Sequence, residues 1–267
     1  MNNRSDPIGV FDSGIGGLTV VSALMQELPS ENIVYFGDTA RVPYGVKSVE
    51  TITRYATEIT TFLLDKKVKA LIVACNTMAA VASQAIENLS PVPVLGVVHA
   101  GAKRAVFETQ NKRVGVIGTP ATITSDAYPS AISTYNPDIE VFSQSCPLFV
   151  PLVEEGWLDH PVTRLTAEEY LRPLMTRDID TLVLGCTHYP LLKPLLRRVL
   201  GDRIRLVDSA ETIGKQTSKL FGEKNLQNRR GKPPEYHFYV TDTPERFREV
   251  GERFLGQTLS KVTVVKW

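Results

Sequence analysis

The sequence predicts an α/β protein made of two pseudo-symmetric domains, each a mainly parallel sheet flanked by helices, with a cleft between them. Continuous Val, Ile and Leu runs alternate with segments of helical periodicity, a pattern typical of parallel sheets covered on both faces. The same order of apolar runs and turns occurs twice, and each time a cysteine follows the third run. With 267 residues, the chain can bury the core of one large domain or of two medium-sized ones.

The first half begins with a short apolar run at 7–11, which predicts a strand. After the turn "DSGIGG", apolar residues recur at helical spacing from Leu18 to Leu28, and Pro29 marks the end of the helix. Further strands are predicted at 32–38, 68–75 and 91–98, with a helix at 78–89 after the third strand.

The second half repeats this order. Ile8-Gly9-Val10 aligns with Val114-Gly115-Val116, and "NIVYFGD" aligns with "DIEVFSQ". "LIVACNT" then aligns with "LVLGCTH", and "VPVLGV" with "IRLVDS". Any two α/β halves share some pattern, but cysteines at one corresponding place favour an internal duplication.

Two domains follow from this repeat. Residues 1–98 and 209–267 are predicted to form the first α/β domain, and residues 99–208 the second. The C-terminal tail contributes a helix at 211–225, a strand at 235–241, another helix and a last strand at 262–266. We expect the tail to return to the first half and complete its sheet. The strand at 235–241 alternates in polarity, so we expect it at a sheet edge with one face toward solvent.

Composition excludes several classes of protein. The formal net charge is +1, and the 30 basic and 29 acidic residues are mixed along the chain, unlike the charge pattern of a nucleic-acid-binding protein. No run reaches the roughly 18 apolar residues of a membrane span, and the polar N-terminus lacks the apolar core of a signal peptide. We therefore expect a soluble cytoplasmic protein with no nucleic-acid or membrane partner.

The three cysteines are odd in number and include no C-x-x-C pair. This count argues against a disulfide scaffold and against a structural zinc site, so no metal is predicted. Free cysteine is most often a small buried apolar residue, and that simple interpretation applies to each of the three until its surroundings are considered.

Ligands of open parallel sheets bind beyond the carboxyl ends of the strands. The turns at those ends are therefore the places where a candidate active site is expected, in the cleft between the domains. Ser, Thr and Asn side chains there can cap the following helix, or they can help its free N–H groups to hold a carboxylate, and both interpretations stay open. The four turns are Asp12-Ser13-Gly14, Cys75-Asn76-Thr77, Thr119-Pro120-Ala121 and Cys186-Thr187-His188.

The glycines of "DSGIGG" do not predict a nucleotide site. The dinucleotide pattern G-x-G-x-x-G needs a third glycine where Thr19 stands, and the Gly-Lys-Ser/Thr of a P-loop is absent. These glycines more simply allow a tight turn and a close approach of backbones.

Two thiols that face one cleft from opposite sides suit racemisation. One base removes a proton from one face of a carbon, and an acid returns a proton to the other face. The ordinary thiol pKa of about 8.5 is close to working pH and can be lowered at a helix N-terminus, so Cys75 and Cys186 can serve as base and acid.

Four motifs, "FDSGIGGLTV", "YFGDTARVPYG", "ACNTMAAVA" and "LGCTHYPLL", together resemble the glutamate racemases, within the cofactor-independent amino-acid racemases. The resemblance extends from about residue 8 to 213. It implies two α/β domains, Cys75 and Cys186 as catalytic residues, no pyridoxal phosphate, other cofactor or metal, and D-glutamate made for bacterial peptidoglycan. It also implies substrate contacts at Asp12, Ser13, Pro43, Tyr44, Gly45, Asn76, Thr77, Thr187 and His188.

Chemistry suggests roles for the titratable residues near the cysteines. Asp12 could pair with the substrate ammonium or tune Cys75. His188 could hydrogen-bond to the Cys186 thiol or act as a proton donor there. Glu154, in "PLVEEG", is a weaker candidate on the Cys186 side, since it could equally be a solvated acid at a helix end. Thr119, in the third turn, is a candidate for substrate binding.

Two further residues have simple structural interpretations. Tyr44 lies in a Pro-Gly turn, where an aromatic ring often only packs against the turn. Cys146 falls outside the repeat and is interpreted as a buried thiol.

Three alternatives remain open at this point. The same chemistry could act on aspartate or another acidic amino acid. A cysteine hydrolase would use Cys186 and His188, but it would leave Cys75 without a role. A binding protein without catalysis would need neither thiol. A homodimer is compatible with the sequence, which does not determine the oligomeric state.

Overall fold

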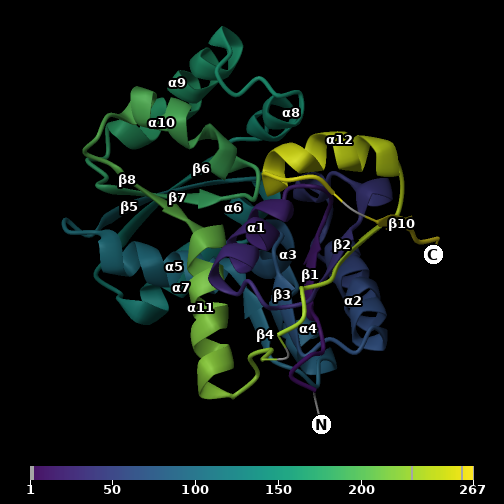
Figure 1. The fold of residues 1–267 in the computed structure, drawn as a ribbon. Helices are drawn as coiled ribbons and strands as arrows, with labels where there is room; N and C mark the ends of the chain where they lie inside the picture. The colour runs from purple at the N-terminus through teal and green to yellow at the C-terminus, as the bar shows by residue number, and fades with distance from the viewer. Residues whose placement is uncertain (1–2, 230, 260, 267) are drawn as a thin grey trace.

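The computed structural model describes residues 3–229, 231–259 and 261–266; residues 1, 2, 230, 260 and 267, which the domain prediction includes, lie outside it. The chain forms two parallel sheets flanked by helices, which confirms the predicted fold class (Figure 1). The first sheet has the order β10 (Val262–Val264), β9 (Tyr236–Val240), β2 (Ile33–Gly37), β1 (Ile8–Asp12), β3 (Ala70–Val73) and β4 (Val94–Gly96). The second has the order β6 (Glu140–Ser145), β5 (Arg113–Gly118), β7 (Thr181–Gly185) and β8 (Arg205–Asp208).

The two sheets share one strand order. Four strands of the first sheet run β2-β1-β3-β4, and the second sheet runs β6-β5-β7-β8, so each half places its first strand between its second and its third. Each pair of aligned sequence units therefore occupies the same place in its sheet, so the topology supports an internal duplication.

The helices lie on the faces and at the ends of these sheets. In the first half they are α1 (Leu18–Glu27), η1 (Thr39–Arg41), η2 (Tyr44–Val46), α2 (Val49–Asp65), α3 (Asn76–Val81) and α4 (Ser83–Leu89). The second half contains α6 (Pro120–Thr124), α7 (Ala127–Tyr135), α8 (Phe149–Glu154), α9 (Pro161–Met175), η3 (Tyr189–Leu192) and α10 (Lys193–Leu200). The helices α5 (Val97–Glu108) and α11 (Ser209–Glu223) connect the halves, and α12 (Pro244–Leu255) lies in the tail.

Local sequence explains where several helices begin. The Ser48 hydroxyl accepts a hydrogen bond from the Thr51 N–H at the start of α2, and the Asp208 carboxylate accepts one from the Ala210 N–H at the start of α11. The helix predicted at 78–89 is split into α3 and α4 at Ala82.

The chain crosses between the halves where β4 passes into α5 and where β8 passes into α11. The domain limits at 98/99 and 208/209 stay predictions.

The tail adds β9 and β10 to the first sheet, where β9 pairs with β2. The expectation that the alternating strand lies at an edge was wrong, because the short β10 occupies the edge and β9 lies inside it. The alternation of β9 has a different physical reason. Phe238 and Val240 are buried on one face, whereas Tyr239 on the other face is only partly covered, by an edge-on contact with Phe62 of α2.

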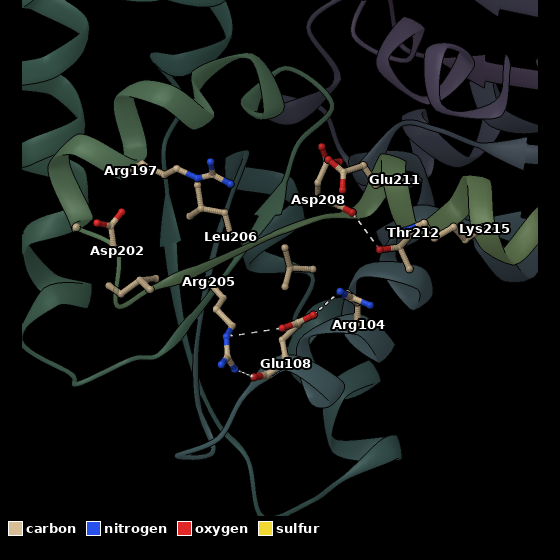
Figure 2. A pocket seen from close by; sticks show the side chains of 13 residues that line it. Arg104, Glu108, Arg197, Asp202, Arg205, Leu206, Asp208, Glu211, Thr212 and Lys215 are labelled. Atoms are coloured by element: carbon tan, nitrogen blue, oxygen red, sulfur yellow. Dashed lines mark hydrogen bonds and ion pairs between the residues drawn. The ribbon is translucent and has the colours of Figure 1, made fainter. Parts of the chain in front are cut away.

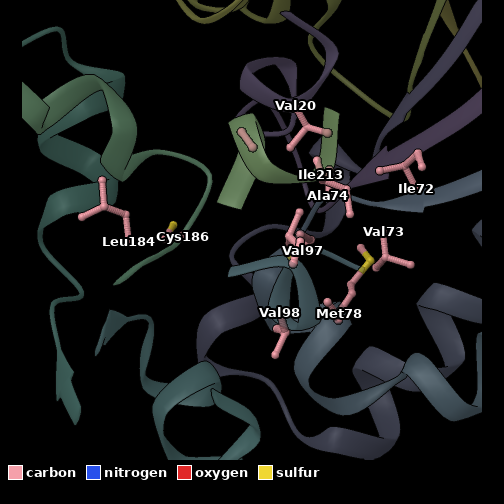
Figure 3. Close-up of a cluster of buried hydrophobic side chains, with 14 of the residues drawn as sticks. Val20, Ile72, Val73, Ala74, Met78, Val97, Val98, Leu184, Cys186 and Ile213 are labelled. Atoms are coloured by element: carbon pink, nitrogen blue, oxygen red, sulfur yellow. The ribbon is translucent and has the colours of Figure 1, made fainter. Parts of the chain in front are cut away.

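The core links the connecting helices to the first sheet (Figure 3). Side chains from α1, β3, α5 and α11, such as Val20, Ile72, Val97 and Ile213, are fully buried in one cluster. Because α5 and α11 begin in this cluster, the two chain crossings are anchored to the first half. None of the helices in the described ranges combines the length and the apolarity that a bilayer span requires.

Candidate active site

A cavity of about 430 Å³ lies between the two halves, at the carboxyl ends of their strands. Both Cys75 and Cys186 line it, one from each half. Most of the predicted site residues line it with them: Ser13, Pro43, Tyr44, Gly45, Asn76, Thr77, Thr119, Glu154, Thr187 and His188. Parallel strands produce this gathering because their carboxyl ends share one edge of each sheet.

Cys75 follows β3 and occupies the N-cap position of α3. Its thiol is buried, with Sγ 3.6 Å from the Ser13 Oγ. Burial raises the pKa of Cys75 to about 12, and the nearby Asp12 carboxylate acts in the same direction. Hydrogen bonds from the N–H groups of Met78 and Ser13 oppose this rise. The free protein therefore keeps Cys75 as a neutral thiol near neutral pH.

Cys186 follows β7 and has a different partner. Its Sγ lies 3.8 Å from Nδ1 of His188, and Nε2 of the same ring lies 3.0 Å from Oε1 of Glu154. Burial alone lowers the pKa of His188, but the hydrogen bonds to Cys186 and Glu154 and their charges raise it to about 10. Near neutral pH the ring is an imidazolium between two acidic groups.

Glu154 lies at the end of α8. From the sequence it could be either an acid–base group on the Cys186 side or a solvated acid at a helix end. Burial raises the pKa of its carboxyl. The hydrogen bond to His188, the charge of His188 and the nearby Arg246 together lower this pKa by more, so the net shift is downward. An ionised carboxylate at this place stabilises the imidazolium. The structure thus brings Glu154 together with His188.

Asp12 ends β1 and is almost fully buried. Its Oδ2 accepts a hydrogen bond from the Gly14 N–H at 3.1 Å, whereas Oδ1 is buried without a hydrogen-bond partner among the described residues. Burial raises the pKa of this carboxyl, and the charge of His188 and several backbone N–H groups oppose the rise. Asp12 is not among the residues that line the cavity, so its predicted contact with substrate stays a prediction.

Asn76 presents an unused donor. Its Oδ1 accepts a hydrogen bond from the Tyr128 hydroxyl at 2.7 Å, which fixes the orientation of the amide. Its Nδ2 is buried, and no described residue accepts a hydrogen bond from it. A buried amide donor without a partner costs free energy unless a ligand supplies an acceptor.

The threonines of the turns differ in their roles. Thr119 caps α6, because its Oγ1 accepts a hydrogen bond from the Thr122 N–H. Thr77 lies at the start of α3 and meets Thr119 across the cleft, with 3.0 Å between their Oγ1 atoms. The Oγ1 of Thr187 lies 3.5 Å from Nδ1 of His188. Capping therefore accounts for Thr119 but not for Thr77 or Thr187.

The loop with Pro43, Tyr44 and Gly45 forms one wall of the cavity. The Tyr44 hydroxyl donates to Asp38, so the ring is held from behind. A Cβ on Gly45 would lie 2.8 Å from the Cβ of Thr119, and only glycine allows this close approach of the two halves.

Asp38 was not among the predicted site residues, although it ends the predicted strand "NIVYFGD". Its Oδ2 accepts hydrogen bonds from Tyr44 and Arg41, and its Oδ1 accepts one from the Thr241 hydroxyl at 2.9 Å. A fully buried carboxylate with these partners fixes the loop that carries Tyr44. The apolar wall of the cavity, formed by Val42, Pro147, Val150 and Pro151, carried no chemical signal in the sequence.

Figure 2 shows a second cavity, of about 390 Å³, lined by α5, β8 and α11. Three of its charged side chains are paired, because Glu108 contacts both Arg104 and Arg205. No thiol or imidazole lines it. Among the described residues, no group of three or more His, Cys, Asp and Glu side chains is placed to hold a metal ion. The cavity with the two thiols is therefore the candidate active site.

Comparison with known proteins gives one consistent answer. The sequence model of the Asp/Glu/Hydantoin racemase family matches residues 14–217. The glutamate racemase of Syntrophus aciditrophicus (strain SB) is 66% identical and covers 100% of both chains, and that of Neisseria meningitidis serogroup A is 56% identical over 98% of this chain and 97% of its own. The crystal structure of glutamate racemase from Francisella tularensis in complex with D-glutamate superposes with a TM-score of 0.94, at 45% identity, over 99% of this chain and 98% of that one.

Proposed function

Since the chain belongs to the Asp/Glu/Hydantoin racemase family, we propose that it interconverts L-glutamate and D-glutamate without a cofactor, with Cys75 and Cys186 as the acid–base pair. One observation carries the proposal. The two thiols follow corresponding strands of the two sheets and line one cavity from opposite halves.

Racemisation with two thiols balances without any other reactant. The thiolate of one cysteine takes the proton from the α-carbon, and the electron pair of that bond stays on the carbon. The thiol of the other cysteine then gives its proton to the opposite face. After the reaction the first cysteine is a thiol and the second is a thiolate, which is the state that the reverse reaction needs.

The surroundings of the two thiols suit this exchange. The Sγ of Cys186 faces the His188 imidazolium, which Glu154 holds in place. The neutral thiol of Cys75 is ready to donate a proton. When the roles reverse, Cys75 must lose its proton, and the buried Asp12, whose pKa is raised, is a carboxyl whose charge acts on that thiol. The two ends of the site therefore reset by different routes.

Neutral donors suit the substrate's carboxylates. No Lys or Arg is among the residues that line the cavity, whereas Ser13, Asn76, Thr77 and Thr187 are. The amide Nδ2 of Asn76 is the strongest candidate, because it is buried and without a partner among the described residues. Neutral donors can hold the substrate's carboxylates without a full positive charge. Such a charge would stabilise the bound substrate as well as the transition state and so would not speed the reaction.

The resemblance to the glutamate racemases also gives the biological role. We propose that D-glutamate from this reaction supplies bacterial peptidoglycan synthesis and that the protein acts in the cytoplasm. A homodimer also stays a prediction.

Chiral chromatography of L-glutamate and L-aspartate, each incubated with the pure protein and no added cofactor, tests the activity and its substrate. We expect D-glutamate to appear and L-aspartate to stay unchanged. D-aspartate formed at a comparable rate would favour the wider substrate class. No product from either amino acid would overturn the proposal.

Single substitutions of the thiols test the mechanism. We expect Cys75→Ala and Cys186→Ala each to abolish racemisation while the circular dichroism spectrum stays that of the parent. Cys146→Ala is the matched control, because this buried thiol lies outside the cavity. A folded variant at Cys75 or Cys186 that keeps more than a few per cent of the activity would overturn the two-thiol assignment.

A further inference from the structure

The tail helix α12 crosses from the first half to the second. It is connected to strands of the first sheet, and Phe247 in its first half packs against Tyr35 of β2 with 5.9 Å between ring centroids. In Figure 1 its other end lies beside α8 of the second half. Three of its side chains contact the pair formed by His188 and Glu154, which the proposed mechanism places behind Cys186.

Phe254 makes the first of these contacts. Its buried ring meets the His188 ring edge-on, with centroids 5.1 Å apart and planes at 80°. Gly16 of the first half also lies against this imidazole, since a Cβ at Gly16 would be 2.5 Å from Nδ1. Elements of the first half therefore fix a catalytic ring that the second half carries.

Two arginines make the other contacts. Arg253 donates from Nη2 to the carbonyl oxygen of Glu154 at 3.0 Å, and its Nη1 lies 2.2 Å from where a Cβ on Gly156 would be. Arg246 lies 3.8 Å from Oε2 of Glu154 and 3.6 Å from Oε1 of Glu155. Arg253 thus holds the backbone at the end of α8, while Arg246 adds a more distant charge.

We propose that α12 is a positioning element for the acid–base group on the Cys186 side, with Phe254 and Arg253 as its positioning residues. Phe254 fixes the plane of the His188 ring, and Arg253 fixes the carboxyl-bearing end of α8. This inference rests on the proposed racemase function of the site.

Geometry explains why such positioning matters. The His188 ring must keep Nε2 on Glu154 while Nδ1 faces the Cys186 thiol, and that second contact is already long at 3.8 Å. A small rotation of the ring would break one of these contacts. Misplacing a catalytic group by about 1 Å can reduce a rate by about 100-fold.

The charges around this ring come from several elements. Cys186 and Glu154 face it from the second half, Asp12 acts on it from β1, and Arg246 of α12 acts through Glu154. Phe254 adds no charge, so its removal tests orientation and packing rather than electrostatics.

The chain offers a matched pair of substitutions on one helix. Phe254→Leu removes the ring that contacts His188, and Phe247→Leu removes a buried ring of the same helix that packs on Tyr35 instead. Both should lower thermal stability to a similar degree. We expect Phe254→Leu to reduce kcat by about tenfold or more with little change in KM. Phe247→Leu should stay within about twofold of the parent, since its catalytic groups keep their geometry.

A second readout does not depend on activity. NMR titration of the ¹⁵N-labelled His188 ring, assigned with a His188→Gln variant, reports its pKa and tautomer. We expect Phe254→Leu to lower this pKa and change the Nδ1 and Nε2 shifts, because the ring no longer faces both acidic partners. Phe247→Leu should leave the His188 titration as in the parent.

Arginine variants test the other half of the proposal. Arg253→Ala should reduce kcat, and Arg253→Lys should restore part of it, because an ammonium can still donate to the Glu154 carbonyl. Arg248→Ala, at an exposed position on the same helix, is the control and should keep the parent's rate.

The outcomes separate the two proposals. A parent protein that racemises no glutamate would overturn the proposed function, whatever the titration shows. An active parent in which Phe254→Leu matches Phe247→Leu in kcat, with an unchanged His188 titration in both, would overturn the role of α12.

Discussion

The Nδ1 atom of His188 lies 3.8 Å from the Sγ atom of Cys186. The corresponding neighbour of the other thiol is a hydroxyl, since the Sγ of Cys75 lies 3.6 Å from the Ser13 Oγ. The halves of the chain share a strand order, yet their two cysteines have different acid–base partners. A pseudo-symmetric fold therefore holds a site whose two ends are chemically unequal.

Replacing Glu154 with Gln should lower the pKa of His188 and the stability of the folded protein. The folded-state pKa of His188 is about 10, above its ordinary 6.5, so its stabilising contribution is complete below pH 6.5 and is lost as pH rises through 10. Glu154 has a lowered pKa, so its own contribution is lost as pH falls through that value. The stability difference between parent and variant should be largest near pH 6 and shrink toward pH 10, as measured by urea unfolding.

Glu155→Gln provides the control for that measurement. Glu155 is exposed beside Glu154, and its side chain has a distant contact with Arg246. It should show a small difference from the parent with little dependence on pH. A Glu154→Gln variant whose loss of stability is the same at pH 6 and pH 10 would contradict the assigned ion pair.

Cys75 should react slowly with iodoacetamide at neutral pH, because the thiolate is the reactive form and the pKa of this thiol is about 12. In a Cys186→Ala background, its alkylation rate should rise by about tenfold per pH unit, with no plateau up to about pH 10. Adding Asp12→Asn removes a carboxylate that raises the pKa of Cys75, so alkylation at a given pH should become faster. Mass spectrometry of the peptide that contains residue 75 follows the reaction, and a plateau below pH 9 would refute the assignment.

Replacing Asn76 or Thr187 with Ala should weaken glutamate binding by about 1–3 kcal/mol, the usual cost when a charged group loses a hydrogen bond. Calorimetry on a Cys186→Ala background keeps the added enantiomer unchanged during the titration. Asn88→Ala, on the exposed side of α4, is the control. Unchanged affinity in the first two variants would mean that these turn residues serve only the fold.

Replacing Gly16 with Ala should impair catalysis more than it impairs folding. The new Cβ would lie 2.2 Å from the Thr187 Oγ1 and 2.5 Å from Nδ1 of His188, so the two halves must shift apart at the site. Gly222→Ala on α11 has its nearest neighbour at 3.9 Å and should keep or raise stability. For each variant, kcat and the melting temperature are measured and compared with those of the parent. Equal kcat values in the two variants would rule out the close contact at Gly16.

Much of this site follows from the ends of apolar runs. Cys75 and Cys186 are predictable because each ends a buried parallel strand, and sheet geometry brings such ends to one edge. Asn76, Thr77 and Thr187 follow from the same argument. The pairing of the two halves could be predicted because the motif around each cysteine is repeated.

Contacts from the tail could not be predicted in this way. The hydrogen bond from Thr241 to Asp38 joins positions 203 residues apart, and that from Arg253 to Glu154 joins positions 99 apart. Neither contact leaves a local pattern, because each depends on how α12 and β9 dock onto elements formed much earlier in the chain. The position of β9 inside its sheet could not be predicted for the same reason. Alternating polarity indicates that a strand is partly buried, but it does not indicate the place of the strand in the sheet.

Isotope labelling tests the two-base mechanism directly. When L-glutamate is incubated in heavy water and the reaction is stopped early, the α-proton leaves to one cysteine. The carbanion then collects a deuteron from the other cysteine, which has already exchanged with solvent. Early D-glutamate should therefore carry deuterium at the α-carbon, while the remaining L-glutamate stays largely protiated, as mass spectrometry of the separated enantiomers would show.

A single shared base would give a different pattern, because the abstracted proton could return to the opposite face and leave the product unlabelled. The unequal surroundings of Cys75 and Cys186 add a second expectation. The same experiment started from D-glutamate should also place deuterium in the product. Its kcat at saturating substrate should respond differently to Glu154→Gln, since only the Cys186 side depends on the His188 imidazolium. The KM values should change in proportion, because two enantiomers are equally stable and kcat/KM must stay equal in the two directions. Early product that is substantially unlabelled in either direction would show that the two thiols do not act on opposite faces.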